Sequence, residues 1–170
     1  MRILVGVIVG LLFAGAVFAN DFVLKSTAFS NNEKVPILYS CDGKDISPAL
    51  AWDNAPANTK SFLLILSSPD WSTGFVNLWI VYNIPSNVKM LSEGANQNLP
   101  KGALVGTNYY YETSYRGPCP PDDFKHHYVF TIYALDTVLD LPEGAEIDDV
   151  LDKSNHHILK QTQLTGIFSH

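Results

Sequence analysis

From Tyr115 to Asp136 the chain reads YRGPCPPDDFKHHYVFTIYALD, and the fold can be inferred outward from this segment. Its first half is a loop stiffened by three prolines, because each proline fixes φ and offers no backbone N–H. Its second half, from Val129 onward, is rich in aromatic and β-branched residues, which is typical of a strand. Two histidines and a tyrosine, at residues 126–128, stand where the loop passes into the strand. A rigid loop that brings polar side chains to the end of a β core favours a small-ligand pocket at this junction.

The 170-residue chain fits one domain, which is preceded by an apolar leader. Residues 3–18 contain no charged or strongly polar side chain, and Arg2 supplies one positive charge before them. Small residues then occupy the two positions that a signal peptidase reads, so we expect residues 1–19 to be a signal peptide cleaved before Asn20. An uncleaved membrane anchor is the alternative, although the run is close to the lower limit of about 17 residues for a spanning helix. The mature domain, residues 20–170, is therefore expected in the periplasm or outside the cell.

The charge of the mature domain excludes some classes of partner. Without Arg2 the 11 basic residues fall to 10 against 17 acidic residues, so the net charge becomes −7. An acidic chain without basic runs repels nucleic acid and anionic membrane surfaces. We therefore expect no nucleic-acid partner and no stable membrane insertion after cleavage.

The chain has two cysteines, Cys41 and Cys119. In an oxidising compartment an even number of cysteines favours a disulfide, which here would tie an early loop to the proline-rich loop. Two buried, unpaired thiols are the alternative, because the sequence does not show whether the two Cα atoms come within bridging distance.

Apolar and β-branched runs predict a mainly β domain. The run at residues 61–67 is unbroken, so we expect it to be covered on both faces. Apolar residues between Ile147 and Leu164 recur at near-helical spacing, which predicts one amphipathic helix at the end of the chain. The expected strands are residues 22–26, 35–39, 61–67, 78–85 and the central strand that ends near Asp136.

Signals for catalysis, cofactors and metals are weak. No Gly-x-Ser-x-Gly turn and no glycine-rich phosphate fingerprint occurs in the sequence. The two histidine pairs, 126–127 and 156–157, consist of adjacent residues, which point in different directions on a strand or a helix. Neither pair should therefore hold one ion together. We expect no enzymatic activity, no cofactor and no metal site.

One small group of residues remains as a candidate ligand site. Because His126 and Tyr128 are two residues apart in a strand, they share one face. An imidazole, a phenol and free backbone N–H groups can all donate hydrogen bonds, which suits a small anion or a phosphorylated head group. Asp70 is expected to accept a hydrogen bond from one nitrogen of His126 and so favour the protonated imidazole. The alternative is that Asp70 only caps a turn. Ordinary sheet residues with satisfied polar tips are the alternative for the whole group. Its members are Asp70, Gly117, Pro118, Cys119, His126 and Tyr128.

Short motifs of a recognisable pattern occur along nearly the whole mature chain. They are YSCDG from Tyr39, ISP at 46–48, LAW at 50–52, TKS at 59–61, Pro69–Asp70, Trp79–Pro85, GPCPP from Gly117 and His126–Asp136. Together these motifs resemble the phosphatidylethanolamine-binding proteins, and in particular their bacterial and archaeal Raf-kinase-inhibitor-like branch. The resemblance implies a β-sandwich of two antiparallel sheets with a helix near the C-terminus. It also implies an anion pocket at the residues that match Asp70, Gly117, Pro118, His126 and Tyr128.

The chain departs from the family pattern at this pocket. The family usually has Asp-Pro-Asp-Ala-Pro where this chain reads SPDWS from Ser68, so the first acid is lost. The family's His-Trp is Leu78-Trp79 here, and its His-Arg is a pair of histidines. Asn77 should face away from the pocket unless a β-bulge intervenes. A pocket in which Leu78, beside Trp79, replaces an imidazole should bind phosphate less strongly and tolerate apolar ligands better.

Two functions of different classes follow from the resemblance. The first is a binding module for a phosphorylated or carboxylated head group, without turnover. The second is an inhibitor of a serine protease or a kinase that uses the pocket rim, as some family members do. Export favours an extracellular protease over a cytoplasmic kinase. Relatives include dimers, so a homodimer is one expected oligomeric state by analogy.

Overall fold

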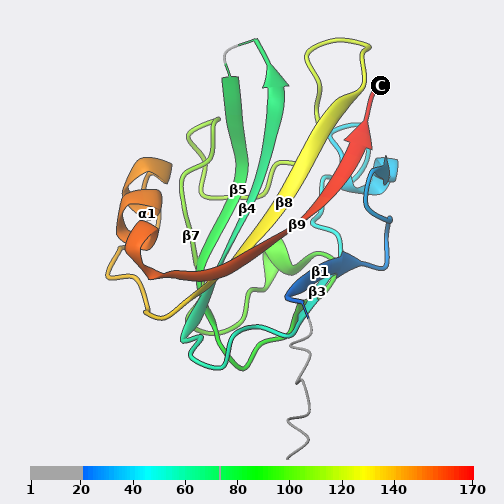
Figure 1. Ribbon diagram of the computed structural model, residues 1–170. Helices are drawn as coiled ribbons and strands as arrows, with labels where there is room; N and C mark the ends of the chain where they lie inside the picture. The colour runs from blue at the N-terminus through cyan, green and yellow to red at the C-terminus, as the bar shows by residue number, and fades with distance from the viewer. Residues whose placement is uncertain (1–20, 73) are drawn as a thin grey trace, which may run out of the picture.

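The computed structural model describes residues 21–72 and 74–170. These residues form two β-sheets and one α-helix (Figure 1). The expected signal peptide and its cleavage point before Asn20 lie outside the described residues. A search of the described part of the chain finds no helix with the length and apolar character needed to cross a membrane.

The larger sheet has six strands in the order β2-β9-β8-β4-β5-β7. Its neighbouring strands are antiparallel, except that the two-residue strand β2 pairs in parallel with β9. The apolar runs at residues 61–67, 78–85 and 129–135 therefore lie on three neighbouring strands of this sheet. Its strands are β2 (Glu33–Lys34), β4 (Ser61–Trp71), β5 (Gly74–Pro85), β7 (Leu104–Val105), β8 (His126–Leu135) and β9 (Ile158–Phe168).

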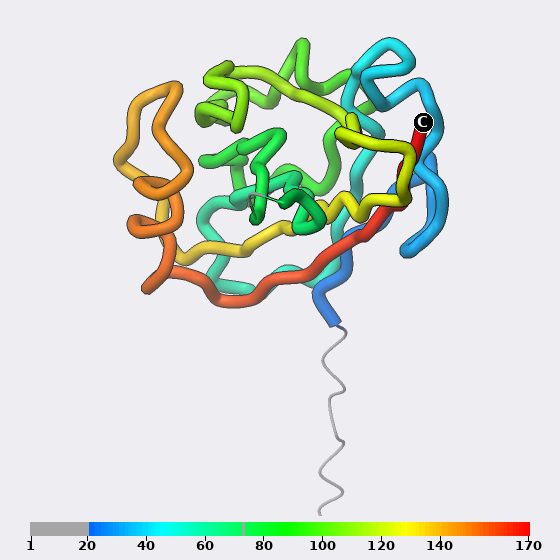
Figure 2. The backbone as a smooth tube through the Cα atoms, turned by 90° about the horizontal axis from the view of Figure 1, so that it is seen from above, coloured from blue at the N-terminus to red at the C-terminus, as the bar shows by residue number. Residues whose placement is uncertain are grey.

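The smaller sheet has three short antiparallel strands in the order β1-β3-β6, and it packs on one face of the larger sheet. The mainly β sandwich predicted from the sequence is confirmed, with the parallel β2–β9 pair as one local exception. Figure 2, seen from above, shows the α-helix at one end of the molecule and the loops near residue 40 at the other. The strands of this sheet are β1 (Val23–Ser26), β3 (Leu50–Asp53) and β6 (Met90–Leu91), and the 3-10 turns are η1 (Ile37–Tyr39), η2 (Ala95–Gln97) and η3 (Asn155–His157).

Alternation along the central strands divides the apolar residues into two clusters. On β4, Phe62 and Leu64 face the smaller sheet, whereas Leu63 and Ile65 face the opposite side. Both sides are buried, as the unbroken run at 61–67 predicts. The side that faces the smaller sheet is called the inner face below, and the opposite side is called the outer face.

The outer face is covered in part by α1 (Ile147–Ser154). Asp148 and Asp149 lie in its first turn, where the helix dipole favours negative charge, and Val150 is buried against the sheet. The prediction that this helix continues to Leu164 was wrong. The chain leaves the helix after Ser154 and forms β9, which pairs with β8 along its length. Pairing with a buried neighbour outweighs the weak helical spacing of a few apolar residues.

The strand expected at residues 35–39 was also wrong. Val35 donates its backbone N–H to the Ile167 carbonyl at 2.9 Å, which extends the β2–β9 pairing by one hydrogen bond. Pro36 cannot donate the next one, and the chain turns into η1 at Ile37. This turn directs the chain toward Cys41 and the loop beside the candidate site.

Candidate functional site

The junction between the proline-rich loop and β8 places its polar residues on two faces. His126 and Tyr128 point to the inner face and are 5% and 0% exposed. His127 lies between them and is exposed on the other face. The sequence prediction that His126 and Tyr128 share a face therefore agrees with this strand's geometry, and His127 is separated from both.

The neighbouring strands bring further residues beside Tyr128. In the β4–β8 ladder Ser67 is opposite Val129, so Ser68 lies next to Tyr128 on the inner face. On β5 the register passes from Trp79 opposite Leu66 to Asn77 opposite Ser67.

The register change leaves one extra residue, Leu78, in a β-bulge. Because of this bulge, Leu78 and Trp79 both face inward and are 1% and 0% exposed. Asn77 instead lines an outer-face cavity, because the extra residue of the bulge places it on the face opposite to Trp79. The bulge therefore turns one more apolar side chain, Leu78, toward the polar residues of β4 and β8.

Four of these inner-face residues carry a buried polar atom with no hydrogen-bond partner. In the described residues six buried side-chain polar atoms lack a partner, and four of the six are the atoms listed below. Leaving a buried polar atom unpaired costs about 1–3 kcal/mol, so a cluster of them is unusual in a folded domain. We call this set the inner-face polar group: Ser68 Oγ, Trp79 Nε1, His126 Nδ1 and the Tyr128 hydroxyl.

The His126 ring is fixed by a residue of its own loop. Its Nε2 lies 2.9 Å from Asp122 Oδ1, and this hydrogen bond lowers the pKa of the Asp122 carboxyl. When Nε2 carries a proton toward this carboxylate, Nδ1 is the nitrogen left to face the inner-face polar group. Sequence reasoning missed Asp122, because nothing in a loop sequence shows which carboxylate folds back onto a ring four residues later.

Asp70 does not hold His126, and that part of the sequence prediction was wrong. Asp70 Oδ2 accepts hydrogen bonds from the His127 backbone N–H at 2.6 Å and from its Nδ1 at 2.7 Å. Partial burial alone would raise the pKa of Asp70, but the hydrogen bonds from His127 outweigh burial and lower it. Both side chains are partly exposed, so the pair closes the end of β4 onto β8 at the surface.

The backbone of the proline-rich loop is tied to the loop that follows η1. The Gly117 N–H, which the sequence prediction left free for a ligand, donates to Asp45 Oδ1 at 2.7 Å. A side chain at Gly117 would place its Cβ 2.0 Å from the Tyr39 carbonyl oxygen, so only glycine allows this close approach. The Pro118 carbonyl accepts the Cys41 N–H at 3.1 Å.

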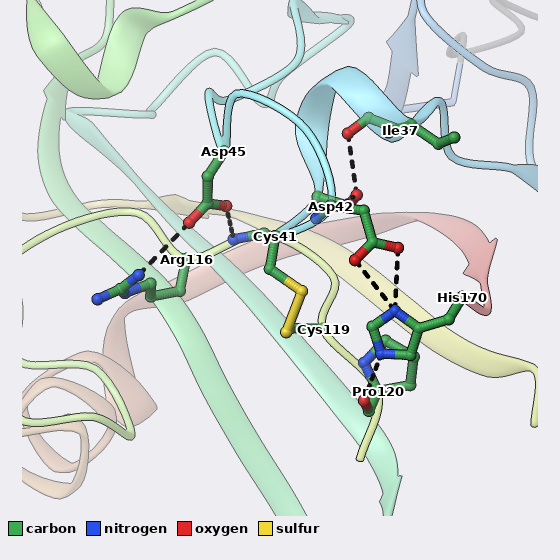
Figure 3. The surroundings of a disulfide bond; sticks show 10 residues. Ile37, Cys41, Asp42, Asp45, Arg116, Cys119, Pro120 and His170 are labelled. Atoms are coloured by element: carbon green, nitrogen blue, oxygen red, sulfur yellow. Dashed lines mark hydrogen bonds and ion pairs between the residues drawn. A yellow bond between two sulfur atoms is a disulfide. The ribbon is translucent and has the colours of Figure 1, made fainter. Parts of the chain in front are cut away.

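The two loops are also joined covalently. Cys41 and Cys119 form a disulfide with Cα atoms 5.4 Å apart, as the pair of cysteines predicts (Figure 3). The same two loops border a cavity of about 220 Å³, and Arg116 is its cation. Arg116 pairs with Glu112 at 2.7 Å and Asp45 at 3.7 Å, so carboxylates already balance its charge.

Tyr128 is fully buried on the inner face. Burial raises the pKa of its phenol well above the usual range. The phenol therefore stays protonated at physiological pH and can donate a hydrogen bond. Trp79 packs edge-on against Tyr115, whose hydroxyl donates to the Tyr39 carbonyl at 2.9 Å. Tyr115 therefore packs on Trp79, one member of the inner-face polar group.

Comparison with known proteins assigns this fold to a family. A sequence model described as phosphatidylethanolamine-binding protein matches residues 25–169. A UPF0098 protein of Methanothermobacter thermautotrophicus is 42% identical over 147 residues, which cover 85% of this chain and 97% of the relative. The chain belongs to the phosphatidylethanolamine-binding protein family. A UPF0098 protein of Aquifex aeolicus is 41% identical over 150 residues and covers 84% of this chain and 85% of its own length.

Two solved structures of the family share the architecture. The phosphatidylethanolamine-binding protein homologue of Chlamydia trachomatis superposes with a TM-score of 0.82 at 38% identity. Escherichia coli YbcL, described as a member of the mammalian family, gives 0.84 at 28% identity. In both cases the match covers 89% of this chain and 99% of the other. The likeness therefore includes both sheets and the loops around the candidate site.

Within this family fold, Ser68 is a second site residue, after Asp122, that sequence reasoning missed. It stands where the family pattern has its first acid, and the structure buries it beside Tyr128. The two-residue period of a strand would have indicated it, since Leu64, Leu66 and Ser68 are spaced two apart and therefore share the inner face. Asp70, the charged residue that was predicted for the site, lies two residues after Ser68 at the partly exposed end of β4.

The described residues offer little to a metal ion. In residues 21–72 and 74–170 no group of three or more His, Cys, Asp or Glu side chains could hold one. Every histidine except His156 has a ring nitrogen within 3 Å of an aspartate oxygen. These four histidines therefore form four separate pairs. The arrangement suits hydrogen bonding to a small polar ligand.

Proposed function

We propose that this protein is a binding module, without turnover, for a small anion or a phosphorylated head group. The observation that carries the proposal is the inner-face polar group, four unpaired buried polar atoms on one face at the end of three adjacent strands. A ligand that accepts hydrogen bonds from Ser68, Trp79 and Tyr128 would satisfy three of them at once. The family's description as phosphatidylethanolamine-binding supports a head group as the ligand.

The charge of the site favours a singly charged or zwitterionic ligand over a phosphate dianion. Ser68, Trp79 and Tyr128 supply neutral donors, and His126 is the one group of the set that can carry a positive charge. When its ring is an imidazolium, Nδ1 donates to an anion; when the ring is neutral with Nε2–H on Asp122, Nδ1 accepts from an ammonium or hydroxyl. Anion binding should therefore be coupled to proton uptake. Leu78, turned inward by the bulge, should accept an apolar part of the ligand.

Export is part of the same proposal. The Cys41–Cys119 disulfide is typical of an oxidising compartment, and residues 3–18 have the composition of a signal-peptide core. Mass spectrometry of the protein purified from its host would test this directly. A mature chain that begins at Asn20 would support export, and an intact Met1 with reduced cysteines would contradict it.

A second function, inhibition of an extracellular serine protease through the rim, is favoured by one surface feature. Phe124 in the loop before β8 is 76% exposed, and Tyr111 is 89% exposed. Exposed aromatic side chains on rigid loops are frequent anchors of protein interfaces. This function uses the outside of the loop and does not need the inner-face polar group.

One set of variants tests both functions. Phosphoethanolamine, inorganic phosphate and acetate should be titrated calorimetrically into the wild type, His126→Ala and the exposed control His156→Ala. The proposal expects binding to wild type and the control, and at least a tenfold loss in His126→Ala, because a charge-assisted hydrogen bond contributes about 1.5–3 kcal/mol. The same proteins, with Phe124→Ala, should be assayed against a panel of serine proteases. Equal binding by His126→Ala contradicts the ligand site, and inhibition that needs Phe124 but not His126 supports the second function.

A further inference from the structure

His170, which follows β9, joins both chain segments of the disulfide. Its Nδ1 lies 2.9 Å from Asp42 Oδ2, and its Nε2 lies 3.0 Å from the Pro120 carbonyl oxygen. Asp42 directly follows Cys41, and Pro120 directly follows Cys119. Figure 3 shows the imidazole between these two partners.

Both partners of the ring are hydrogen-bond acceptors at neutral pH. A carboxylate and a carbonyl have no proton to give, and a neutral imidazole has a single N–H. Only the imidazolium can donate to both Asp42 and Pro120 at once. In the neutral ring one nitrogen carries no proton, and its lone pair faces the lone pair of an acceptor. One of the two hydrogen bonds is therefore lost.

We propose that His170 is a pH-sensitive clasp that holds the Cys41 and Cys119 loops together when its ring is protonated and releases one of them when the ring is neutral. The charged groups that act on the ring are Asp42 and, more weakly, Asp123, and the ring also lies edge-on to Phe168. The hydrogen bonds to Asp42 and Pro120 raise the pKa of His170 above its ordinary value of 6.5. Because the pKa is raised in the folded state, the clasp is complete below pH 6.5 and is lost as pH rises through the raised value.

The clasp differs from the other contacts between the two loops. The Gly117–Asp45 bond joins a backbone N–H to a carboxylate, and the Cys41–Pro118 bond joins two backbone groups. His170 adds an imidazole to these contacts, and an imidazole can change its charge near neutral pH. A pH above the raised pKa of His170 should therefore leave the loops joined at Gly117 and loosen them at Pro120, because the single N–H of the neutral ring stays with the charged Asp42.

The loosened end leads directly to the candidate site. Pro120 is two residues before Asp122, the carboxylate that fixes the His126 ring at 2.9 Å. Release of the Pro120 carbonyl should let Asp122 move and so weaken the orientation of His126. This effect on ligand affinity rests on the proposed function, whereas the clasp itself does not.

Proton NMR titration of the histidine rings tests the clasp without any ligand. In the wild type the His170 resonance should titrate above the ordinary histidine value of 6.5. In Asp42→Asn the His170 midpoint should fall by roughly half a pH unit or more, because the anionic partner is lost. A His170 midpoint at or below 6.5 in the wild type, or no change in Asp42→Asn, would overturn the proposal.

Amide hydrogen exchange tests whether the clasp orders the loop. Protection factors at residues 122–125 should be compared between pH 5.5 and 8.5 in the wild type, His170→Ala and the control His156→Ala. His126 is present in all three proteins, so only the difference between them reports on His170. The wild type and the control should lose protection severalfold as pH rises, and His170→Ala should start low and lose little. Identical profiles in the wild type and His170→Ala would refute the clasp, even if the binding proposal holds.

Discussion

The imidazole of His126 is held at Nε2 by Asp122, 2.9 Å away, and not by Asp70, which lies across the strand and binds His127. This finding assigns the two carboxylates to different tasks. Asp122 sets which nitrogen of the buried ring faces the inner-face polar group. Asp70 closes the surface end of β4 onto β8.

The first prediction follows from that assignment. Asp122→Ala should weaken binding of phosphoethanolamine by about five- to tenfold at pH 6, because the ring loses its fixed orientation and a favourable charge. Asp70→Ala, which removes a carboxylate of similar exposure from the neighbouring strand, should change affinity less than twofold. Calorimetric titration of both variants checks this. The reverse order of effects would return Asp70 to the site and remove Asp122 from it.

The second prediction concerns acid stability. The His127 contacts lower the pKa of Asp70 from its ordinary value of 3.8, so Asp70 stabilises the fold above that value and loses this contribution as pH falls through its lowered folded pKa. Asp70→Asn should therefore lower the free energy of unfolding by about 0.5–1 kcal/mol at pH 6, a small value because the pair is partly exposed. Urea unfolding at pH 6, 4 and 3 checks this. The deficit should shrink below pH 4, and a constant deficit would mean that the charge plays no part.

The sandwich could be predicted because its central strands are long apolar runs. The segment at 61–67 and the run that ends at Pro85 are buried on both faces, and such runs have few alternatives to a central strand. The segment after Ser154 could not be predicted in the same way. Residues 158–161 are exposed on both faces, and buried residues alternate only from Leu164 onward. The apolar pattern therefore does not distinguish helix from strand, and pairing with β8 decides between them.

The site was predicted in part for a related reason. His126 and Tyr128 follow from the two-residue period of a strand, and so would Ser68 if a neutral residue had been given the same weight as a charged one. The positions of Asp122 and His170 depend on where loops fold back over 4 and 128 residues of sequence, respectively. No local pattern encodes contacts of that kind.

The third prediction concerns the disulfide. Cys41 and Cys119 are 78 residues apart, and closing a loop of that length stabilises a fold by about 4 kcal/mol in the chain-entropy description. The double variant Cys41→Ser with Cys119→Ser should therefore melt about 8–16 °C below the wild type. Calorimetry with and without a reductant checks this, and the reductant should lower the melting temperature of the wild type only. A variant that melts like the oxidised wild type would show that the loops are held by their hydrogen bonds alone.

The last prediction tests what the β-bulge does for the ligand. Leu78 is buried and faces inward beside Trp79, so Leu78→His should place a second imidazole next to the inner-face polar group. Affinity for inorganic phosphate should then rise about tenfold at pH 6, because a charge-assisted hydrogen bond contributes about 1.5–3 kcal/mol and part of it is spent on burying the ring. The gain should be smaller at pH 8, where the added imidazole is neutral.

Leu78→Asn is the matched control for this prediction, since it loses the same apolar contact but cannot become a cation, and it should not gain affinity. Calorimetric titration of the three proteins at both pH values decides the matter, with thermal melts to confirm that each is folded. Equal phosphate affinity in the wild type and a folded Leu78→His would mean that the bulge does not face the ligand and that Leu78 is an ordinary core residue.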